Sequence, residues 1–415
     1  MKGLLVASVG ASFGAAALLA GSAAWADCGI EKGSVRILSN DFEALHIVAS
    51  GAEECASATV TVTKNQTTEH KTIQVPALTT DPATYTVAMV ANNSIVPLLN
   101  GGLIRPLDEY VAKWGQQLTP NQLVKVDGKV MGIAFMINDQ HVVYRKDLLE
   151  QAGVQPPKTY EDILAAAQAL RDKGIMQDPL AANFKPGWDL AEEFVNMYQG
   201  YGGEFFEPGT AKLAIDNKEG AQALATLKAM SGFMSRDFVT YDTNSVKPIW
   251  EAGKVAIATV WGSRVGAFVD AEGAAPGVSE NSVVTEAPTV GGGTVPASSL
   301  WWDGFAIAGN ISDEDAEASF RAMMHGIRPE VAKAHPDVTA WLIAGAEPTP
   351  ALAGVFATAK AGARPYPMLP YMGILHTALG NELAEYMQGQ EDAKKALADV
   401  TQAYNTAAKE NGFLN

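Results

Sequence analysis

Apolar residues recur at two different spacings along the chain, and these spacings predict strands and helices in turn. Residues 42–56 carry apolar side chains at helical spacing. A second helix is expected from Ser94 to the pair Gly101–Gly102, with Pro97 in its first turn. Short runs of apolar and β-branched residues, typical of strands, are 35–38, 58–63 and 85–90. This alternation predicts an α/β fold with a largely parallel sheet covered by helices on both faces.

The middle of the chain is more helical. Three helix starts are predicted where a carboxylate follows a capping side chain by three residues: Thr159 with Asp162, Asp189 with Glu192, and Asp216 with Glu219. Strands are expected at 255–260 and 302–308, and the loop at 272–299, rich in Gly, Pro and Ser, is interpreted as a flexible surface segment.

The last part of the chain is predicted to be mainly helical. Ser312 and Asp315 favour the start of a helix that ends near Gly326. Two further helices are expected at 371–388 and 391–410, each followed by a glycine.

The N-terminus has the pattern of a secretory signal peptide. Lys2 supplies a positive charge, residues 4–19 are apolar, and Ala24-Trp25-Ala26 has the small residues that signal peptidase reads. We therefore expect residues 1–26 to be removed, the mature chain to begin at Asp27, and the protein to be periplasmic. No later segment reaches about 18 uninterrupted apolar residues, the length of a membrane span.

Length and charge narrow the class of protein. The 415 residues are too many for one core and suggest two domains. The formal net charge of −16 opposes binding to nucleic acid or to an anionic membrane surface.

Two cysteines, Cys28 and Cys55, remain in the exported chain. In an oxidising compartment they are expected to form one disulfide, which stabilises by about 3 kcal/mol on the chain-entropy model; two free thiols are the alternative. With six scattered histidines there is no ligand spacing for a metal, so neither a metal nor a cofactor is expected.

Catalytic motifs are missing from the sequence. It contains no G-x-S-x-G and no H-E-x-x-H. A pair of carboxylates for glycoside hydrolysis is not excluded, but most Asp and Glu fall at helix caps or on solvent faces. The protein is expected not to be an enzyme.

Aromatic and polar residues at strand ends suggest a ligand site. Flat aromatic rings bind the apolar faces of sugars, and Asn, Asp and Arg bind their hydroxyls. Trp250 is assigned to the core, and one of Trp301 and Trp302 is expected to face a cleft. Salt bridging is the alternative for the arginines, and helix capping for the Asn and Asp residues. The candidates are Asn40, Asp41, Asn92, Asn93, Trp188, Trp261, Arg264, Trp301, Trp302 and Arg364.

Several segments resemble the carbohydrate-type, maltose-binding-protein-like extracellular solute-binding family of ABC importers. The resemblance covers essentially the whole mature chain in the right order. The matching segments are 102–110 (GLIRPLDEY), 127–133 (DGKVMGI), 142–149 (VVYRKDLL), 153–162 (GVQPPKTYED), 249–256 (IWEAGKVA) and 364–413.

The resemblance implies a two-lobed periplasmic-binding-protein fold with a central ligand cleft and three crossings, near 136–140, 301–304 and 347–350. The first lobe would comprise 27–136 and 304–347, and the second 137–303 and 348–415. By position, the family's ligand contacts would fall on the residues above and on Asp303, with His376 where relatives carry a stacking aromatic. Asp139 is a further candidate carboxylate.

The function implied is capture of a carbohydrate, a mono- or short oligosaccharide or a derivative, by a monomer that delivers it to permease subunits of an ABC importer. Arg264 stands where some relatives have a stacking Trp, which leaves room for an acidic or sulfonated sugar held by Arg264 and Arg364. The alternatives are another solute in the same fold, such as a polyol or a polyamine, and a periplasmic glycoside hydrolase.

Overall fold

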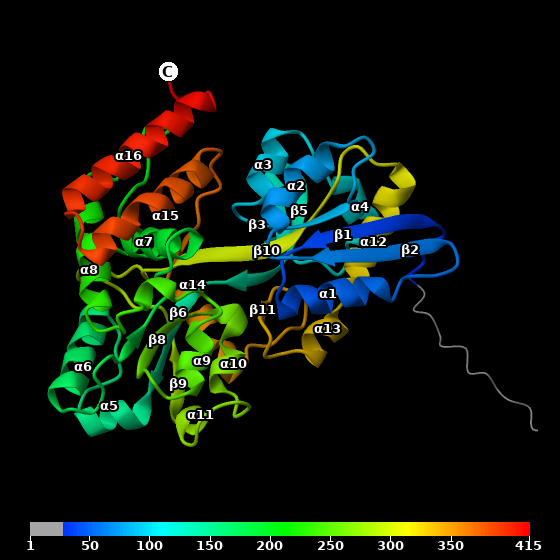
Figure 1. Cartoon of the computed structure of the whole chain (residues 1–415). Helices are drawn as coiled ribbons and strands as arrows, with labels where there is room; N and C mark the ends of the chain where they lie inside the picture. Colours follow the sequence, from blue (N-terminus) through cyan, green and yellow to red (C-terminus); the bar gives the residue numbers. More distant parts are fainter. Residues whose placement is uncertain (1–27) are drawn as a thin grey trace, which may run out of the picture.

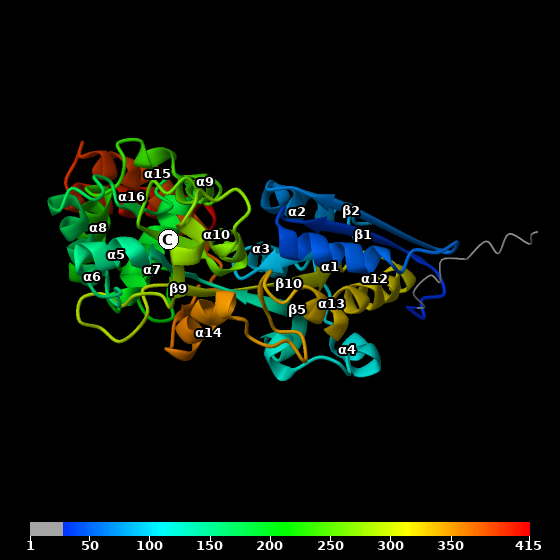
Figure 2. The same cartoon turned by 90° about the horizontal axis from the view of Figure 1, so that it is seen from below.

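Two α/β lobes lie side by side in the computed structural model, which describes residues 28–415 (Figures 1 and 2). The signal peptide predicted at residues 1–26 lies outside the described residues. Each lobe has its own sheet and its own hydrophobic core. In Figure 1 the long strand β10 (Ser299–Ile307) runs between the lobes.

The sheet of the first lobe has eight strands within residues 28–415, in the order β11-β5-β10-β3-β1-β2, with β4 paired to β5 and β12 to β10. The strands assigned to this lobe besides β10 are β1 (Gly33–Ser39), β2 (Val60–Gln66), β3 (Val87–Ala91), β4 (Leu123–Val126), β5 (Lys129–Asn138) and β11 (Ala340–Trp341). Its helices are α1 (Glu43–Glu53), α2 (His70–Thr79), α3 (Ile95–Asn100), α4 (Asp108–Trp114), η1 (Pro120–Gln122), α12 (Asp313–Gly326) and α13 (Pro329–Ala334).

The expectation of a largely parallel sheet is wrong. β1 is parallel to β2 and β3, but β10 is antiparallel to both β3 and β5. The reason is the path of the chain: β5 leads out of this lobe, and β10 returns from the other lobe in the opposite direction.

Helices α1 and α12 cross at two glycines. A Cβ on Gly51 would lie 2.9 Å from the Cα of Gly326, and a Cβ on Gly326 would lie 2.4 Å from the backbone oxygen of Val48. Glycine at both positions therefore lets the two backbones touch.

The capping side chain of Ser312 accepts a hydrogen bond from the backbone N–H of Asp315, as predicted.

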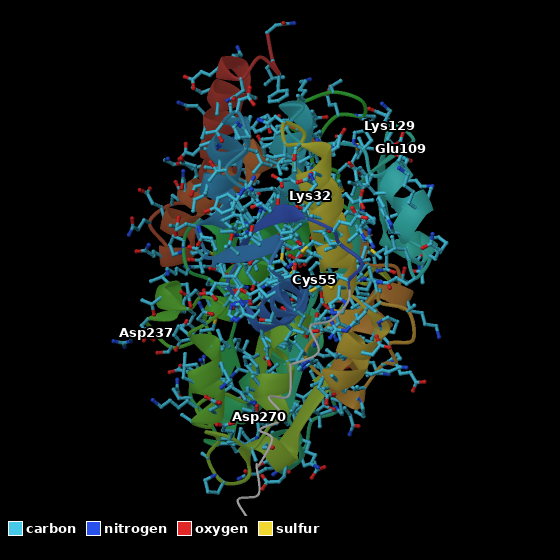
Figure 3. All side chains as sticks on the ribbon, turned by 90° about the vertical axis from the view of Figure 1, so that its right-hand side faces the viewer. Lys32, Cys55, Glu109, Lys129, Asp237 and Asp270 are labelled. Carbon is cyan, nitrogen blue, oxygen red and sulfur yellow. A yellow bond between two sulfur atoms is a disulfide. The ribbon has the colours of Figure 1, made fainter. Side chains whose placement is uncertain are left out.

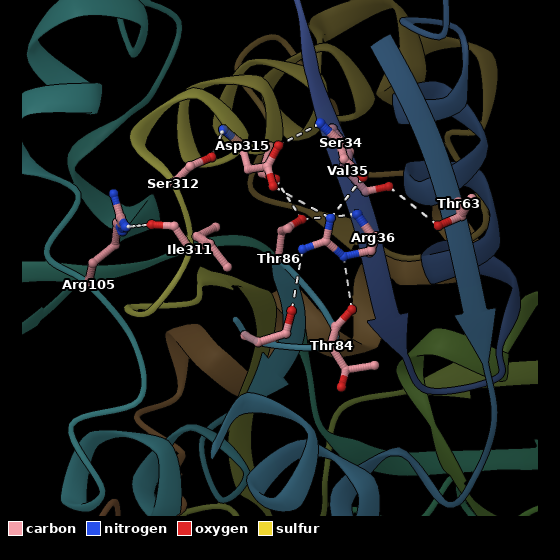
Figure 4. Close-up of polar contacts among 12 residues, drawn as sticks. Ser34, Val35, Arg36, Thr63, Thr84, Thr86, Arg105, Ile311, Ser312 and Asp315 are labelled. Atoms are coloured by element: carbon pink, nitrogen blue, oxygen red, sulfur yellow. Dashed lines mark hydrogen bonds and ion pairs between the residues drawn. The ribbon is translucent and has the colours of Figure 1, made fainter. Parts of the chain in front are cut away.

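Asp315 also ties α12 to the first strand (Figure 4). Its carboxylate accepts a hydrogen bond from the backbone N–H of Ser34 at 2.8 Å and lies 3.5 Å from the guanidinium of Arg36. Arg36 in turn donates to the backbone oxygen of Thr84 at 2.9 Å. These bonds join α12, β1 and the segment before β3.

The predicted disulfide is confirmed. Cys28 and Cys55 are bonded, with their Cα atoms 5.5 Å apart. Cys55 follows α1, so the bond ties the first described residue to the end of that helix (Figure 3).

The sheet of the second lobe has four strands within the described residues, in the order β7-β8-β6-β9. They are β6 (Gln140–Arg145), β7 (Leu180–Ala181), β8 (Ile257–Trp261) and β9 (Ser282–Thr285), and the short β12 (Arg364–Pro365) pairs with the start of β10. The helices are α5 (Lys146–Ala152), α6 (Tyr160–Asp172), α7 (Trp188–Gly200), α8 (Lys218–Ser231), η2 (Phe238–Thr240), α9 (Val246–Glu251), η3 (Gly262–Arg264), α10 (Gly266–Val269), α11 (Val278–Asn281), η4 (Pro350–Leu352), α14 (Ala353–Lys360), α15 (Met372–Gln388) and α16 (Ala393–Glu410).

Three sequence predictions in this lobe need correction. The segment 272–299 is not one loop, because it contains α11 and the strand β9, which pairs with β6. The cap of α8 is the side chain of Asn217 rather than Asp216. Helix α7 begins after Gly187, so Asp189 lies in its first turn instead of capping it. The capping box of Thr159 and Asp162 is confirmed.

The chain passes between the two cores three times. Met136 belongs to the first core and Val142 to the second, and β10 carries Trp301 in the second core and Phe305 in the first. The third passage lies between β11 and η4. Among residues 28–415, no helix combines the length and the apolar character needed to cross a membrane.

Candidate ligand-binding site

A cleft of about 450 Å³ lies between the lobes, at the edge where β1, β2, β3 and β8 end. Open α/β sheets bind ligands at this edge. The first lobe contributes Asn40, Asp41, Phe42, Thr68, His70, Lys71, Thr72 and Ala91. The second lobe and the crossing strands contribute Asn138, Trp188, Asp189, Asp242, Thr243, Asn244, Trp261, Ser263, Arg264, Trp301 and Asp303.

Three tryptophans form one side of this cleft, and we call them the tryptophan wall: Trp188, Trp261 and Trp301. Their ring centroids are 5.7–6.2 Å apart. Each comes from a different element, since Trp188 begins α7, Trp261 ends β8 and Trp301 lies in β10. Packing from three elements holds the rings as one apolar surface that faces the polar residues of the first lobe.

A second layer of side chains holds the wall from behind. The ring of His376 lies 5.2 Å from that of Trp188, and the ring of Tyr366 lies 4.2 Å from that of Trp301. Burial lowers the pKa of His376 to about 3, so its imidazole is neutral. Its Nε2 lies 3.1 Å from the backbone oxygen of Trp188, which only accepts, so Nε2 carries the proton and Nδ1 accepts from the Tyr366 hydroxyl.

Buried carboxyl groups lie under the same wall. The indole Nε1 of Trp301 donates to Glu192 Oε1 at 2.8 Å. Burial raises the pKa of Glu192 well above its usual range and that of Glu193 to about 7. Glu193 accepts hydrogen bonds from the backbone N–H and the side-chain amide of Asn183. These bonds fix α7 to the floor of the cleft.

The start of α7 depends on two glycines. Gly187 has a φ of 102°, which favours glycine, and its N–H donates to the backbone oxygen of Gly380 on α15 at 2.9 Å. A Cβ on Gly380 would lie 2.4 Å from the backbone oxygen of Gly187. The close approach of Gly187 and Gly380 positions Trp188, which follows Gly187 in the chain.

Charged side chains face the tryptophan wall. The Nζ atom of Lys71, on α2 of the first lobe, lies 4.9 Å from the ring centroid of Trp188 in the second lobe. The side chain of Lys71 is exposed to water. Desolvation by the surrounding protein atoms nevertheless lowers the pKa of Lys71, and attraction to Asp303 opposes this shift. Burial raises the pKa of Asp303 to about 7, and Lys71 opposes that shift in turn.

Most carboxylates at the rim of the cleft already have partners in the protein. Asp41 lies 2.7 Å from His46 Nε2, and Asp242 pairs with Lys185 at 3.0 Å. Asp189 accepts a hydrogen bond from the Thr243 hydroxyl at 2.8 Å.

A family model described as bacterial extracellular solute-binding protein matches residues 59–323, well over half of the chain. The protein belongs to this family. The curated relatives of this solute-binding protein include the polygalacturonan/rhamnogalacturonan-binding protein YtcQ of Bacillus subtilis (strain 168), 22% identical over 224 residues, which are 49% of this chain and 43% of the relative. The match thus spans less than half the length of that relative.

Solved structures confirm the fold. A maltose-bound MalE3 of T. maritima superposes with a TM-score of 0.75 at 17% identity, covering 90% of this chain and 99% of the other. A solute-binding protein of an ABC transporter from Agrobacterium radiobacter K84, in complex with ribitol, gives a TM-score of 0.76 at 18% identity, with 90% and 98% covered. The two-lobed α/β fold expected from the sequence is therefore correct, and both neighbours are binding proteins.

Seven of the residues predicted from the sequence of this solute-binding protein come together in the cleft. Five of them lie at or just after the end of a strand or at the start of a helix, and the other two lie within β10. They are Asn40, Asp41, Trp188, Trp261, Arg264, Trp301 and Asp303.

The other predicted residues do not line the cleft. All but Asn93 have a structural contact instead, and the side-chain oxygen of Asn93 is buried without a hydrogen-bond partner among the described residues. The side-chain oxygen of Asn92 accepts from the backbone N–H of Trp302 at 2.8 Å, and Trp302 packs on the first core. Asn93 is half-buried beside them. Arg364 pairs with Glu204 at 2.7 Å. His376 supports Trp188 from behind.

Asp139 is the sixth of these residues, and it lies at the first passage between the lobes. Its carboxylate is fully buried and lies 2.9 Å from Nδ1 of His141. Burial raises the pKa of Asp139, and the hydrogen bond from His141 opposes the shift. Its position suits a part of the hinge better than a ligand contact.

The sequence reasoning missed several residues of the cleft, Lys71 above all. Thr68 belongs to the turn between β2 and α2, and His70 and Lys71 begin α2. Helix α2 carries Pro76 inside it, so its helical pattern is weak. The one usable signal was the polar run Thr67-Thr68-Glu69 directly after a β-branched strand. Asn138 ends β5, and Thr243 and Asn244 stand in a turn whose direction the sequence does not determine.

Within residues 28–415, one group of three side chains has the residue types and spacing of a metal site: Cys28, Cys55 and His325. Its two sulfur atoms are joined in the disulfide, so they are not free thiolates for a metal ion.

Proposed function

We propose that this protein captures a hydroxyl-rich small molecule, a mono- or short oligosaccharide or a sugar derivative, between its two lobes. The observation that carries the proposal is the tryptophan wall facing a row of hydrogen-bonding groups across one cleft. A pyranose ring has an apolar face that packs on aromatic rings and polar edges that bind Asn, Asp, Lys and Arg.

Capture by closure suits the way in which the lobes are joined. Each lobe has its own core, and the connections run through three passages near the cleft, so the lobes are free to turn as bodies. A ligand that contacts both lobes stabilises the closed form, because its contacts exist together only there. The contact of Lys71 with Trp188 joins the first lobe to the second across the cleft.

What the solved neighbours bind supports the ligand class. The titles of these structures name maltose, ribitol and, for a protein of Agrobacterium vitis S4, D-mannitol. All three are neutral polyhydroxy compounds. Their proteins share the fold of this chain at 17–18% identity, so the individual ligand is a separate question.

We further propose that the mature protein acts in the periplasm as a monomer and delivers its ligand to the permease subunits of an ABC importer. Support comes from the family, whose description is extracellular, and from the signal-peptide pattern in the sequence. On this proposal the protein holds its ligand without transforming it.

The two alternative functions make different demands on the cleft. A polyamine receptor needs several free carboxylates and no cations, whereas Lys71 and Arg264 both line this cleft. A glycoside hydrolase needs an acid and a base on either side of the scissile bond. It would release the chromophore from nitrophenyl glycosides, and such turnover by the purified protein would refute the binding proposal.

A thermal-shift screen with a panel of sugars and polyols tests the proposal directly. A ligand at a hundredfold excess over its Kd stabilises the folded state by about 2.7 kcal/mol. We expect at least one sugar or polyol to raise the Tm, with calorimetry giving one site per chain. No shift with any member of a broad panel would contradict the proposal.

A further inference from the structure

Two cations in the cleft, Lys71 and Arg264, form no salt bridge with a carboxylate among the described residues. Within residues 28–415, the ammonium group of Lys71 forms no hydrogen bond or ion pair, and its contact is with the face of Trp188. The guanidinium group of Arg264 donates to the amide oxygen of Asn244 at 2.8 Å and is in no salt bridge with the described residues. Lys71 belongs to the first lobe and Arg264 to the second, so closure encloses both.

Carboxyl groups nearby attract these cations, Asp303 acting on Lys71 and Asp189 on Arg264, but in the described part of the chain none forms an ion pair with them. Asp41, Asp189 and Asp242 already have partners, as described above. Asp303 has no hydrogen-bond partner for its carboxyl among the described residues, but its pKa of about 7 means that it is partly uncharged at neutral pH. Burial also raises the pKa of Asp189.

An unpaired charge enclosed in a closing cleft is costly unless the ligand supplies a partner. The indole Nε1 of Trp188 is also buried without a partner in the described part of the chain, and it too is a donor. The ammonium of Lys71 and the indole Nε1 of Trp188 therefore offer hydrogen atoms and lack an acceptor, and the guanidinium of Arg264 has a neutral one.

We infer that the ligand is an anionic sugar, whose carboxylate or sulfonate group binds the ammonium of Lys71 while its hydroxyl groups reach Asp303 and its ring packs on the tryptophan wall. The inference rests on the proposed function and names the ligand class for the same cleft. The sequence suggested that Arg264 and Arg364 would hold an acidic sugar. Lys71 takes that role in place of Arg364, because Arg364 is paired with Glu204 away from the cleft.

Calorimetry with matched sugars tests this inference. The pairs are D-glucuronate with D-glucose and D-galacturonate with D-galactose, and 6-sulfo-6-deoxy-D-glucose and D-glucosamine form two further arms. We expect an acidic member to bind at least about tenfold more tightly than its neutral partner, as a charge-assisted hydrogen bond provides. The carboxylate and sulfonate arms identify the anionic group, and the amine should bind most weakly.

Variants separate the charge from the rest of the cleft. Lys71→Gln should abolish the preference for the acid, Lys71→Arg should keep it, and Asp303→Asn should increase it. Lys129→Gln is the matched control, because this exposed lysine of the first lobe lies outside the cleft and the substitution changes the net charge equally (Figure 3). The Tm of each variant verifies that it is folded.

The outcomes distinguish the two proposals. Neutral sugars that bind as tightly as their acids, with Lys71→Gln weakening both equally, would overturn the anionic ligand and leave sugar binding intact. If no sugar or polyol of any charge bound, the proposed function would fall, and the inference with it.

Discussion

Neighbouring residues of one strand have different environments in this protein. The side chain of Trp301 lines the cleft and donates to Glu192, whereas Trp302 packs on the first core. Alternation along a strand sends consecutive side chains to opposite faces. The sequence predicted that one of the two faces the cleft, and only the register of β10 on β5 determines which.

Trp301→Phe should weaken sugar binding about tenfold, since the ring loses area against the sugar. It should also cost about 1–2 kcal/mol of stability, because Glu192 loses its donor. Trp302→Phe is the matched control and should change the affinity less than about twofold. Calorimetry and urea unfolding measure both quantities; equal losses of affinity in the two variants would place the ligand elsewhere.

Asp303 makes stability depend on pH. Its pKa rises from 3.8 to about 7 on folding, so the folded state favours the protonated carboxyl. The stability that it contributes is therefore complete below about pH 4 and is lost as the pH rises to about 7. Unfolding free energies of the wild type and of Asp303→Asn, measured from pH 4 to pH 8, isolate this group.

The variant should gain stability over the wild type steadily between pH 4 and pH 7, and the difference should level off above that range. Glu193 also has a pKa of about 7, but it is common to both proteins and cancels in the difference. A difference that does not change with pH would show that Asp303 titrates normally.

At the scale of elements, the sequence predicted where most helices and strands lie. Caps and glycine stops are local signals, and they located α6, α12, α15 and α16. The direction of β10 was not predictable, because it depends on the chain leaving one lobe and returning. Helix α2 was missed since Pro76 interrupts its pattern, and Lys71 was missed with it.

The joint between α7 and α15 offers a test at this scale. Gly380→Ala would place a methyl group 2.4 Å from the backbone oxygen of Gly187, so the helices must move apart. We expect a loss of about 1–3 kcal/mol of stability and weaker sugar binding, because Trp188 moves with α7. Gly373→Ala on the same helix is the control.

A Cβ on Gly373 has open space around it, so that variant should be as stable as the wild type or slightly more stable. Chemical unfolding and calorimetry apply to both. Unchanged affinity in Gly380→Ala, despite a loss of stability, would mean that the position of Trp188 does not matter for the ligand.

At the scale of the whole molecule, the two cores and the cleft between them are the basis for the proposal that ligand binding and closure of the lobes are coupled. The residues that line the cleft are divided between two lobes that the chain joins by three passages, so neither lobe alone forms the cleft. The family resemblance predicted a cleft between two lobes from the sequence. The sequence did not determine which charges face the cleft, because those depend on where elements such as α2, which carries Lys71, begin.

Small-angle X-ray scattering of the protein with and without its ligand tests the central claim most directly. We expect that saturation, verified by calorimetry on the same sample, reduces the radius of gyration as the lobes close. A protein that is saturated with sugar by calorimetry but scatters as it did without the sugar would contradict capture between two closing lobes.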